Sequence, residues 1–370
     1  MGRKKKVVVP PPDSDVWQNT TEFRILERKV KRKGQFDESL LENLQDKPCH
    51  TIQLFNRSIK VIAFDKFPGL YYIPNAIPVE LQKSIVKEAL EEWVRPPNVC
   101  NLDSHFHLNP NGIWNEYVAW KNSSQSEPKI KKRNFDTVQV DQYAPPSRNT
   151  TEENCETCKV TAELKKKPLV SVLDTDTNVI IDAPVTKMSS NDDQNITQVL
   201  PRLRWCTLGH QYNWSIKEYH FDRVPPFPQS IVDISNEIVH SLEGLTQYPS
   251  SKWKPEAGII NFYQPGDTLT AHQDKSEINT QAPLLSFSFG LECVFLFGTE
   301  DKSEKPIALK LKSGDMVVMS GPGRRAFHGV PLVIKDTLPD TLKANGDKDW
   351  DLFQDYLSHT RVNLNLRQVY

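Results

Sequence analysis

Long uninterrupted hydrophobic runs are missing from this sequence of 370 residues. The most apolar run, 283–298, is broken by Ser286, Ser288 and Glu292. The charged N-terminus is not followed by the apolar segment that a signal peptide requires. The sequence therefore predicts neither a membrane-spanning helix nor a secretory signal, and we expect no membrane partner.

The chain also has few cysteines and almost no net charge. The six cysteines have no regular spacing, which is typical of a reducing compartment. A formal net charge of −1 gives no overall attraction to nucleic acid, so such binding must come from local basic patches. The runs 3–6, 28–33, 129–133 and 165–167 are candidates, although such runs also serve nuclear import or lie on ordinary solvated surface. We expect the protein in the nucleus and cytoplasm, with the mitochondrion left open.

A His-x-Asp motif follows a strand-like segment and a turn. Residues 258–263 have strand character, and 264–267 (Gln-Pro-Gly-Asp) predict the turn. Residues two apart on a strand face the same way, so His272 and Asp274 can direct their side chains to one point, with His328 as the third group. Two histidines and one carboxylate leave metal positions open, which suits non-haem Fe(II) that activates O2. Taken alone, a His-x-Asp pair is more often an ordinary surface or core pair.

The C-terminal run 361–367 alternates polar and apolar side chains at every position. Its polar face carries Arg361, Asn363, Asn365 and Arg367. An ordinary solvated strand face is one interpretation. Inside a barrel, however, a buried unpaired guanidinium is very costly, and a bound dicarboxylate would remove that cost. Asn261 and Tyr263, also two residues apart, can supply further polar contacts to the same ligand.

Short strands and two upstream helices are predicted. Segments 283–290 and 307–311 alternate, and 293–297 and 316–319 are apolar, which favours a sandwich or barrel over βαβ units. One helix is predicted over 79–93, with Pro78 at its start and an apolar stripe of Leu81, Ile85, Ala89 and Trp93. A second is predicted over 229–242, with Ser230 and Asp233 as a capping box and Gly244 just past its end.

Four segments together resemble one known family. They are 261–263 (Asn-Phe-Tyr), 272–277 (His-Gln-Asp-Lys-Ser-Glu), 323–330 (Gly-Arg-Arg-Ala-Phe-His-Gly-Val) and 361–367 (Arg-Val-Asn-Leu-Asn-Leu-Arg). The sequence resembles the AlkB-type Fe(II)/2-oxoglutarate dioxygenases, and within them the eukaryotic AlkB homologue 1 branch. The resemblance implies a mainly β (α+β) fold, a double-stranded β-helix or jelly-roll core with flanking helices upstream.

The resemblance also implies roles for the residues of these segments. The Fe(II) ligands would be His272, Asp274 and His328. The co-substrate 2-oxoglutarate would be held by Asn261, Tyr263, Arg361 and Arg367, with Asn363 supporting that site. Dioxygen would be the remaining reactant.

Substrate contacts are expected ahead of the catalytic strands. By resemblance, Trp205 lies where the family lines its base pocket, and His210 stands where bacterial AlkB has a tyrosine, with Tyr212 close by; a core-packed edge strand is the alternative. Enzymes that modify a base hold it between rings. Arg324, beside His328, is predicted to contact the backbone of the flipped nucleotide. Ser276 replaces a substrate-contacting carboxylate of bacterial AlkB, which leaves the preferred base open.

Composition divides the chain into four parts. Residues 1–50 are predicted to be a basic, largely disordered segment, and 51–120 a helical substrate-recognition region. Residues 121–195 form a polar low-complexity insertion, and 196–370 the catalytic domain. The insertion contains Cys155-x-x-Cys158, to which we assign no zinc because no second ligand pair follows at finger-like spacing.

The predicted activity is oxidative demethylation of N-methylated bases in nucleic acid by a monomer, releasing formaldehyde, succinate and CO2. The resemblance implies tRNA, with 1-methyladenine as an example, while DNA remains possible. A demethylase or hydroxylase of protein lysines, such as those of histones, would use the same iron site with another pocket. An abasic-site DNA lyase is a further alternative, and it would not depend on iron.

Overall fold

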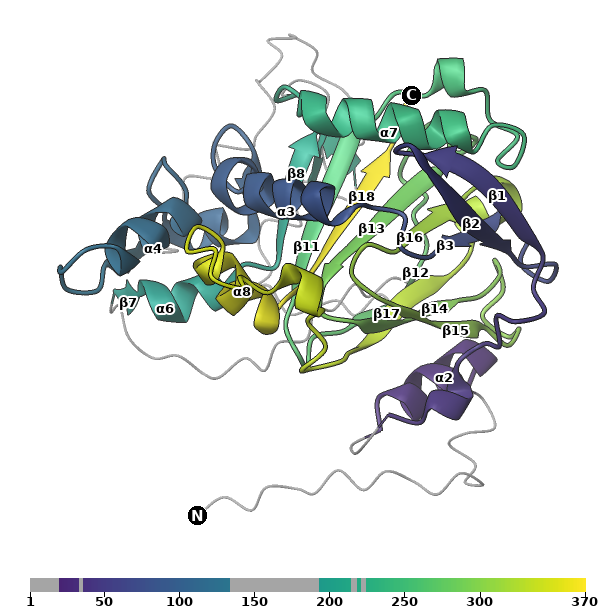
Figure 1. The fold of residues 1–370 in the computed structure, drawn as a ribbon, viewed down its shortest axis with the longest axis horizontal. Coiled ribbons are helices and arrows are strands. Elements are labelled where there is room, and N and C mark those ends of the chain that lie inside the picture. The colour runs from purple at the N-terminus through teal and green to yellow at the C-terminus, as the bar shows by residue number, and fades with distance from the viewer. Residues whose placement is uncertain (1–19, 33–35, 134–192, 214–217, 221–223) are drawn as a thin grey trace, which may run out of the picture.

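Two antiparallel sheets face each other in this molecule, and most helices lie on the outer side of the larger one (Figure 1). The computed structural model describes residues 20–32, 36–133, 193–213, 218–220 and 224–370. The large sheet has the order β1-β2-β3-β16-β13-β18-β11-β8-β4, and the small sheet β12-β17-β14-β15. Strands β16, β13, β18 and β11 oppose the small sheet, which is the arrangement of a double-stranded β-helix. The predicted fold class is confirmed.

The strands follow the chain in a simple order. Those before the core are β1 (Cys49–Leu54), β2 (Arg57–Ala63), β3 (Leu70–Ile73), β4 (Val99–Cys100), β5 (Phe106–His107), β6 (Lys129–Lys132), β7 (Gln194–Asn195), β8 (Trp205–Gly209), β9 (Gln211–Asn213) and β10 (Glu218–His220). The core strands are β11 (Ala257–Tyr263), β12 (Leu269–His272), β13 (Leu284–Gly290), β14 (Cys293–Phe297), β15 (Ile307–Leu311), β16 (Met316–Met319), β17 (His328–Val333) and β18 (Arg361–Arg367).

The helices are short. They are α2 (Glu22–Val30), α3 (Val79–Glu88), α4 (Ile113–Lys121), α6 (Ile196–Val199), α7 (Gln229–Ser241) and α8 (Asp351–Ser358). Single turns of 3-10 helix are η1 (Glu38–Leu40), η3 (Asn101–Ser104), η7 (Leu200–Arg202), η8 (Ser250–Lys252), η9 (Gly321–Arg325) and η10 (Asp340–Leu342), and η2 (Ala89–Trp93) is a π-helical turn. In the part of the chain that the structure describes, no helix is both long and apolar enough to cross a membrane.

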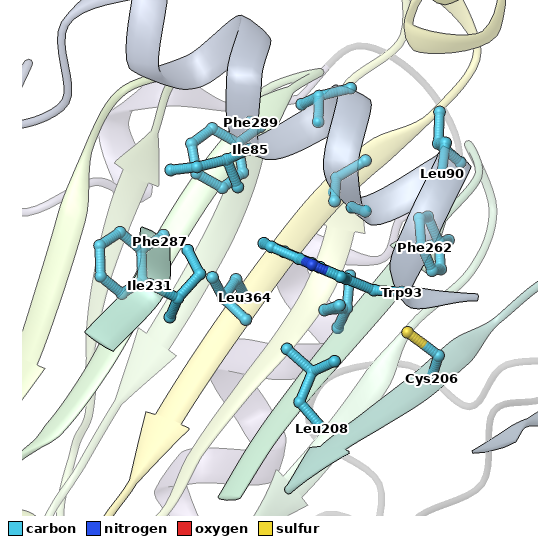
Figure 2. Close-up of a cluster of buried hydrophobic side chains, with 14 of the residues drawn as sticks. Ile85, Leu90, Trp93, Cys206, Leu208, Ile231, Phe262, Phe287, Phe289 and Leu364 are labelled. Carbon is cyan, nitrogen blue, oxygen red and sulfur yellow. The ribbon is translucent and has the colours of Figure 1, made fainter. Parts of the chain in front are cut away.

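The alternation of β18 separates two environments. Its apolar side chains, Val362, Leu364 and Leu366, join the main hydrophobic core beneath α3 and α7. Figure 2 shows Trp93 of the π-helical turn lying over Leu364 and Leu208 in this core. The opposite face of β18 points between the sheets, so the sheet packing places its polar residues in the interior of the barrel.

Both predicted helices are present, with differences at their ends. The first continues through η2 to Trp93 as predicted, but Pro78 precedes it as the N-cap. In α7 the predicted capping box is wrong: Pro228 is the N-cap, and no side chain caps this end. The Ser230 hydroxyl donates instead to Glu88 of α3, 2.8 Å away, because the tertiary partner competes with the local cap.

The described residues of the N-terminal segment are more ordered than predicted. Helix α2 buries Phe23, Leu26 and Val30 against Val294 and other residues of the small sheet. The prediction of a largely disordered region over 1–50 is therefore corrected for the described residues of that range. The basic run 3–6 lies outside the described residues.

The predicted insertion begins later than its composition indicated. Strand β6 pairs with β5 and β7, so 129–132 and 194–195 belong to a small three-stranded sheet. Residues 51–120 contribute β1 to β4 to the same large sheet as the core strands. The Cys155-x-x-Cys158 pair and the run 165–167 lie outside the described residues.

Candidate metal and co-substrate site

Two histidines face each other across neighbouring strands of the small sheet. His272 ends β12 and is the direct cross-strand partner of His328, which begins β17. Their ring centroids are 4.3 Å apart. Gly329 allows this close approach, because a Cβ there would lie 2.8 Å from the carbonyl oxygen of Leu269 on β12. The sheet itself therefore places the two imidazoles together.

Asp274 completes the group from just beyond the end of β12. Its carboxylate and the ring nitrogens of His272 and His328 all lie within 4.8 Å of one another. The predicted grouping of these three residues is confirmed, but the predicted geometry is wrong in one respect. The strand ends at His272, so the loop, and not strand alternation, directs Asp274 inward.

Backbone carbonyls fix the tautomer of both imidazoles. Nδ1 of His272 lies 3.0 Å from the carbonyl oxygen of Thr270, and Nδ1 of His328 lies 3.1 Å from that of Ala326. A carbonyl only accepts, so each Nδ1 carries the hydrogen and each Nε2 keeps its lone pair for a metal. Burial, reinforced by His328, lowers the pKa of His272 to about 4, which keeps this ring in the neutral, metal-binding form.

Asp274 stays ionised in this setting. Burial alone would raise its pKa, but the Arg367 guanidinium and the two imidazoles outweigh burial and hold the pKa well below its usual value. Nη2 of Arg367 lies 2.9 Å from Oδ2 of Asp274. Two imidazoles and a carboxylate, with no further His, Cys, Asp or Glu in the group among the described residues, fit Fe(II) with open positions.

Arg361 provides the second half of the site. Its side chain is 1% exposed, and Nη2 donates to Oγ of Ser288 at 3.1 Å. Within the described ranges, its Nε and Nη1 have no hydrogen-bond partner. A buried guanidinium with two unused donors carries a large desolvation cost that a carboxylate would remove. The residues present therefore fit a dicarboxylate such as 2-oxoglutarate.

Three more predicted co-substrate residues surround Arg361. Tyr263 is its cross-strand partner, and Asn261 is the partner of Asn363. Nδ2 of Asn363 donates to Oγ of Ser286 at 2.9 Å and to the carbonyl oxygen of Phe287 at 2.7 Å, which ties β18 to β13. The register thus brings these side chains together, and their contact with 2-oxoglutarate stays a prediction.

Arg367 has different surroundings from those predicted. Besides Asp274, its Nε lies 3.4 Å from Oε1 of Glu277. The carboxylates that Arg367 contacts are thus those of Asp274 and Glu277, near the metal ligands. Its predicted contact with 2-oxoglutarate remains a prediction.

The predicted substrate residues lie along one side of the barrel. Trp205 is the cross-strand partner of Asn261 and is half-buried. The His210 ring meets Tyr370 edge to face at 5.5 Å. The Tyr212 hydroxyl lies 3.0 Å from Oγ of Ser276, two residues after Asp274. The hairpin β9–β10 therefore adjoins the metal loop and β8 adjoins the strand that carries Asn261, while contact of these residues with a base stays a prediction.

The prediction for Arg324 is wrong. Its side chain is 1% exposed, so it offers no charge to a phosphate. Nη2 lies 2.9 Å from Oε2 of Glu277, and Nη1 donates to the carbonyl oxygen of Asp274 at 2.6 Å. Sequence reasoning missed Glu277, although it stood inside the motif 272–277; its position five residues after a metal ligand was the available signal.

Comparisons with known proteins agree with this geometry. A family model described as the 2OG-Fe(II) oxygenase superfamily matches residues 181–367. The chain belongs to this superfamily. It is therefore an Fe(II)/2-oxoglutarate-dependent enzyme, and the predicted cofactors are confirmed at the level of the family.

Relatives place the chain near the AlkB homologue 1 branch. The "tRNA demethylase abh1" of Schizosaccharomyces pombe is 34% identical over 84% of this chain and 82% of its own length. "Nucleic acid dioxygenase ALKBH1" of Mus musculus is 29% identical over 84% of this chain and 66% of its own. "DNA N(6)-methyladenine demethylase ALKBH1A" of Arabidopsis thaliana is 28% identical over 85% of this chain and 79% of its own. The resemblance to this branch is confirmed.

Proposed function

We propose that this oxygenase removes N-methyl groups from bases in nucleic acid, with tRNA as its main substrate. The observation that carries the proposal is the grouping of His272, Asp274 and His328, together with the buried Arg361, which has two donor atoms without a partner in the described chain. All three relatives above bear names of nucleic-acid enzymes, two of them demethylases, and the one with the highest identity is named for tRNA.

The residues divide the work of such a reaction. His272, Asp274 and His328 would hold the metal through two Nε2 atoms and one carboxylate, and Arg361 would receive the distal carboxylate of 2-oxoglutarate. When bound, Fe(II), 2-oxoglutarate and O2 supply the oxidant that hydroxylates the N-methyl group, which leaves as formaldehyde while 2-oxoglutarate becomes succinate and CO2. Trp205 provides an aromatic face on which the extruded base can stack.

The deciding experiment compares methylated bases in both kinds of nucleic acid. Oligonucleotides of RNA and DNA that contain 1-methyladenine, 3-methylcytosine, 5-methylcytosine or N6-methyladenine are incubated with and without 2-oxoglutarate, and products are identified by mass spectrometry. We expect demethylation that requires 2-oxoglutarate and is fastest in RNA. Preference for DNA would overturn the tRNA assignment.

Two further arms test the alternatives. A methylated histone peptide replaces the oligonucleotide in the first, and an abasic DNA strand in the second. Turnover of the peptide alone would favour a protein demethylase. Strand cleavage that persists with a chelator and without 2-oxoglutarate would favour a lyase.

A further inference from the structure

A buried network of charges connects the metal carboxylate to the β9–β10 hairpin. Glu277 lies at its centre and is itself buried. Its two carboxylate oxygens are shared among three side chains: Oε1 accepts from the Tyr219 hydroxyl at 2.6 Å and faces Nε of Arg367 at 3.4 Å, while Oε2 pairs with Arg324 at 2.9 Å. The three partners of Glu277 come from three different segments of the chain.

The network is balanced in charge. Two carboxylates, Asp274 and Glu277, face two guanidinium groups, Arg324 and Arg367. Arg367 is shared between the two carboxylates, since its Nη2 contacts Asp274 while its Nε faces Glu277. Arg324 holds the same loop from the other side through the carbonyl oxygen of Asp274. Both guanidinium groups that contact Asp274 are therefore also paired with Glu277.

We propose that Glu277 is a positioning residue for the iron site, which holds Arg367 and Arg324 in place around Asp274 and ties the β9–β10 hairpin to the metal loop through Tyr219. Without the Glu277 charge, the buried network gains one net positive charge beside a cation site. Arg367 is then free to pair more closely with Asp274 and to withdraw its oxygen from the metal. This inference rests on the proposed iron-dependent function.

The hairpin contact connects the network to the predicted substrate residue Tyr212. Tyr219 packs edge to face on Tyr212, with ring centroids 5.1 Å apart, and the Tyr212 hydroxyl adjoins Ser276. Burial raises the pKa of Tyr219 well above its usual value, so its hydroxyl stays protonated and donates to Glu277. A nucleic acid that displaces the hairpin would thus act on the same carboxylate that restrains Arg367.

The test measures metal binding without any substrate. Co(II) is titrated into the full-length, metal-free protein, and its visible absorption gives both affinity and coordination. Glu277→Gln keeps the size of the side chain and removes the charge. We expect its Co(II) affinity to fall by about ten- to hundredfold, the range found when outer partners of metal ligands are lost, with a changed spectrum. Tyr219→Phe should give a smaller loss in the same direction.

Asp315→Asn is the matched control. Asp315 is also a buried carboxylate that accepts a hydrogen bond from a tyrosine hydroxyl, that of Tyr72 at 2.7 Å. Its carboxylate also accepts from the backbone amides of Asn75 and Lys312, which are far from the metal loop in the chain. Its Co(II) affinity should equal that of the wild type even where its melting temperature falls. Equal Co(II) affinity in Glu277→Gln and the wild type, or an equal loss in both variants, would overturn the inference. If the wild type itself binds no Co(II), the iron site and the proposed function fail instead.

Discussion

Arg361 and Arg367 begin and end the same strand, on the same face, yet only one of them has a carboxylate partner within the described chain. Arg367 contacts Asp274 and Glu277, whereas Arg361 reaches only a serine hydroxyl. The two guanidinium groups are thus prepared for different tasks. Arg367 organises the metal side of the site, and Arg361 is left to receive an anion from outside the protein.

Replacing Arg361 should weaken the binding of 2-oxoglutarate and, at the same time, make the ligand-free protein more stable to heat. In Arg361→Met, affinity for 2-oxoglutarate should fall on the order of ten- to hundredfold, because charge-assisted hydrogen bonds contribute about 1.5–3 kcal/mol. The ligand-free variant should melt at a higher temperature than the wild type, since it no longer buries an unpaired charge. Calorimetric titration of the metal-loaded protein and thermal melts measure the two effects.

Arg325→Met serves as the control for this variant. Arg325 is exposed and pairs with the exposed Glu300 at 3.0 Å, so both properties should stay near their wild-type values. Oligonucleotide binding should be unaffected in either protein. Wild-type affinity for 2-oxoglutarate in Arg361→Met would remove this residue from the co-substrate site.

Removing the metal carboxylate should abolish turnover while leaving the fold in place. An ion that binds only the folded state raises the melting temperature of a protein. Asp274→Ala lacks one of the three ligands, so Co(II) should raise the melting temperature of the wild type but not that of this variant. Asp340→Ala, at an exposed aspartate in η10, is the control and should keep both activity and the Co(II) effect. Full activity in Asp274→Ala would refute the assigned metal set.

Trp205→Ala should lower kcat/KM for oligonucleotides. The loss should correspond to about 1–3 kcal/mol, the energy of one stacking contact. Consumption of 2-oxoglutarate without substrate should continue at the wild-type rate, because the metal ligands are untouched. Trp120→Ala on α4 is the control, since its ring packs beside Tyr117 instead. An unchanged kcat/KM in Trp205→Ala would assign this tryptophan to packing alone.

Trp93→Ala should cost about 3–5 kcal/mol of the free energy of unfolding, because the ring is buried between the π-helical turn and the large sheet (Figure 2). Denaturant titration measures the loss. Glu92→Ala, one residue earlier and exposed, should change stability by less than about 1 kcal/mol. A similar loss in both variants would show that the turn, and not the buried ring, is responsible.

The sequence predicted those parts of the molecule that follow from local pattern. Strict alternation in 361–367 predicted which side of β18 faces the barrel interior, and spacing of apolar residues predicted the helix that begins at Val79. It could not predict the burial of Arg324, because its partner Glu277 lies 47 residues away and comes close only when the sheets pack. The burial of α2 against Val294 was missed for the same reason.

The metal ligands come from the small sheet and its loop, and Arg361 comes from the large sheet opposite. The distance between the metal ligands and the Arg361 guanidinium is therefore set by the volume of the side chains that pack between the two sheets. That space holds Phe295, Phe297 and Leu284, none of which carries a polar group. A change of volume there would move Arg361 relative to the metal ligands, so the co-substrate would no longer fit between them and turnover would fall, even though every reactive side chain was still in the sequence.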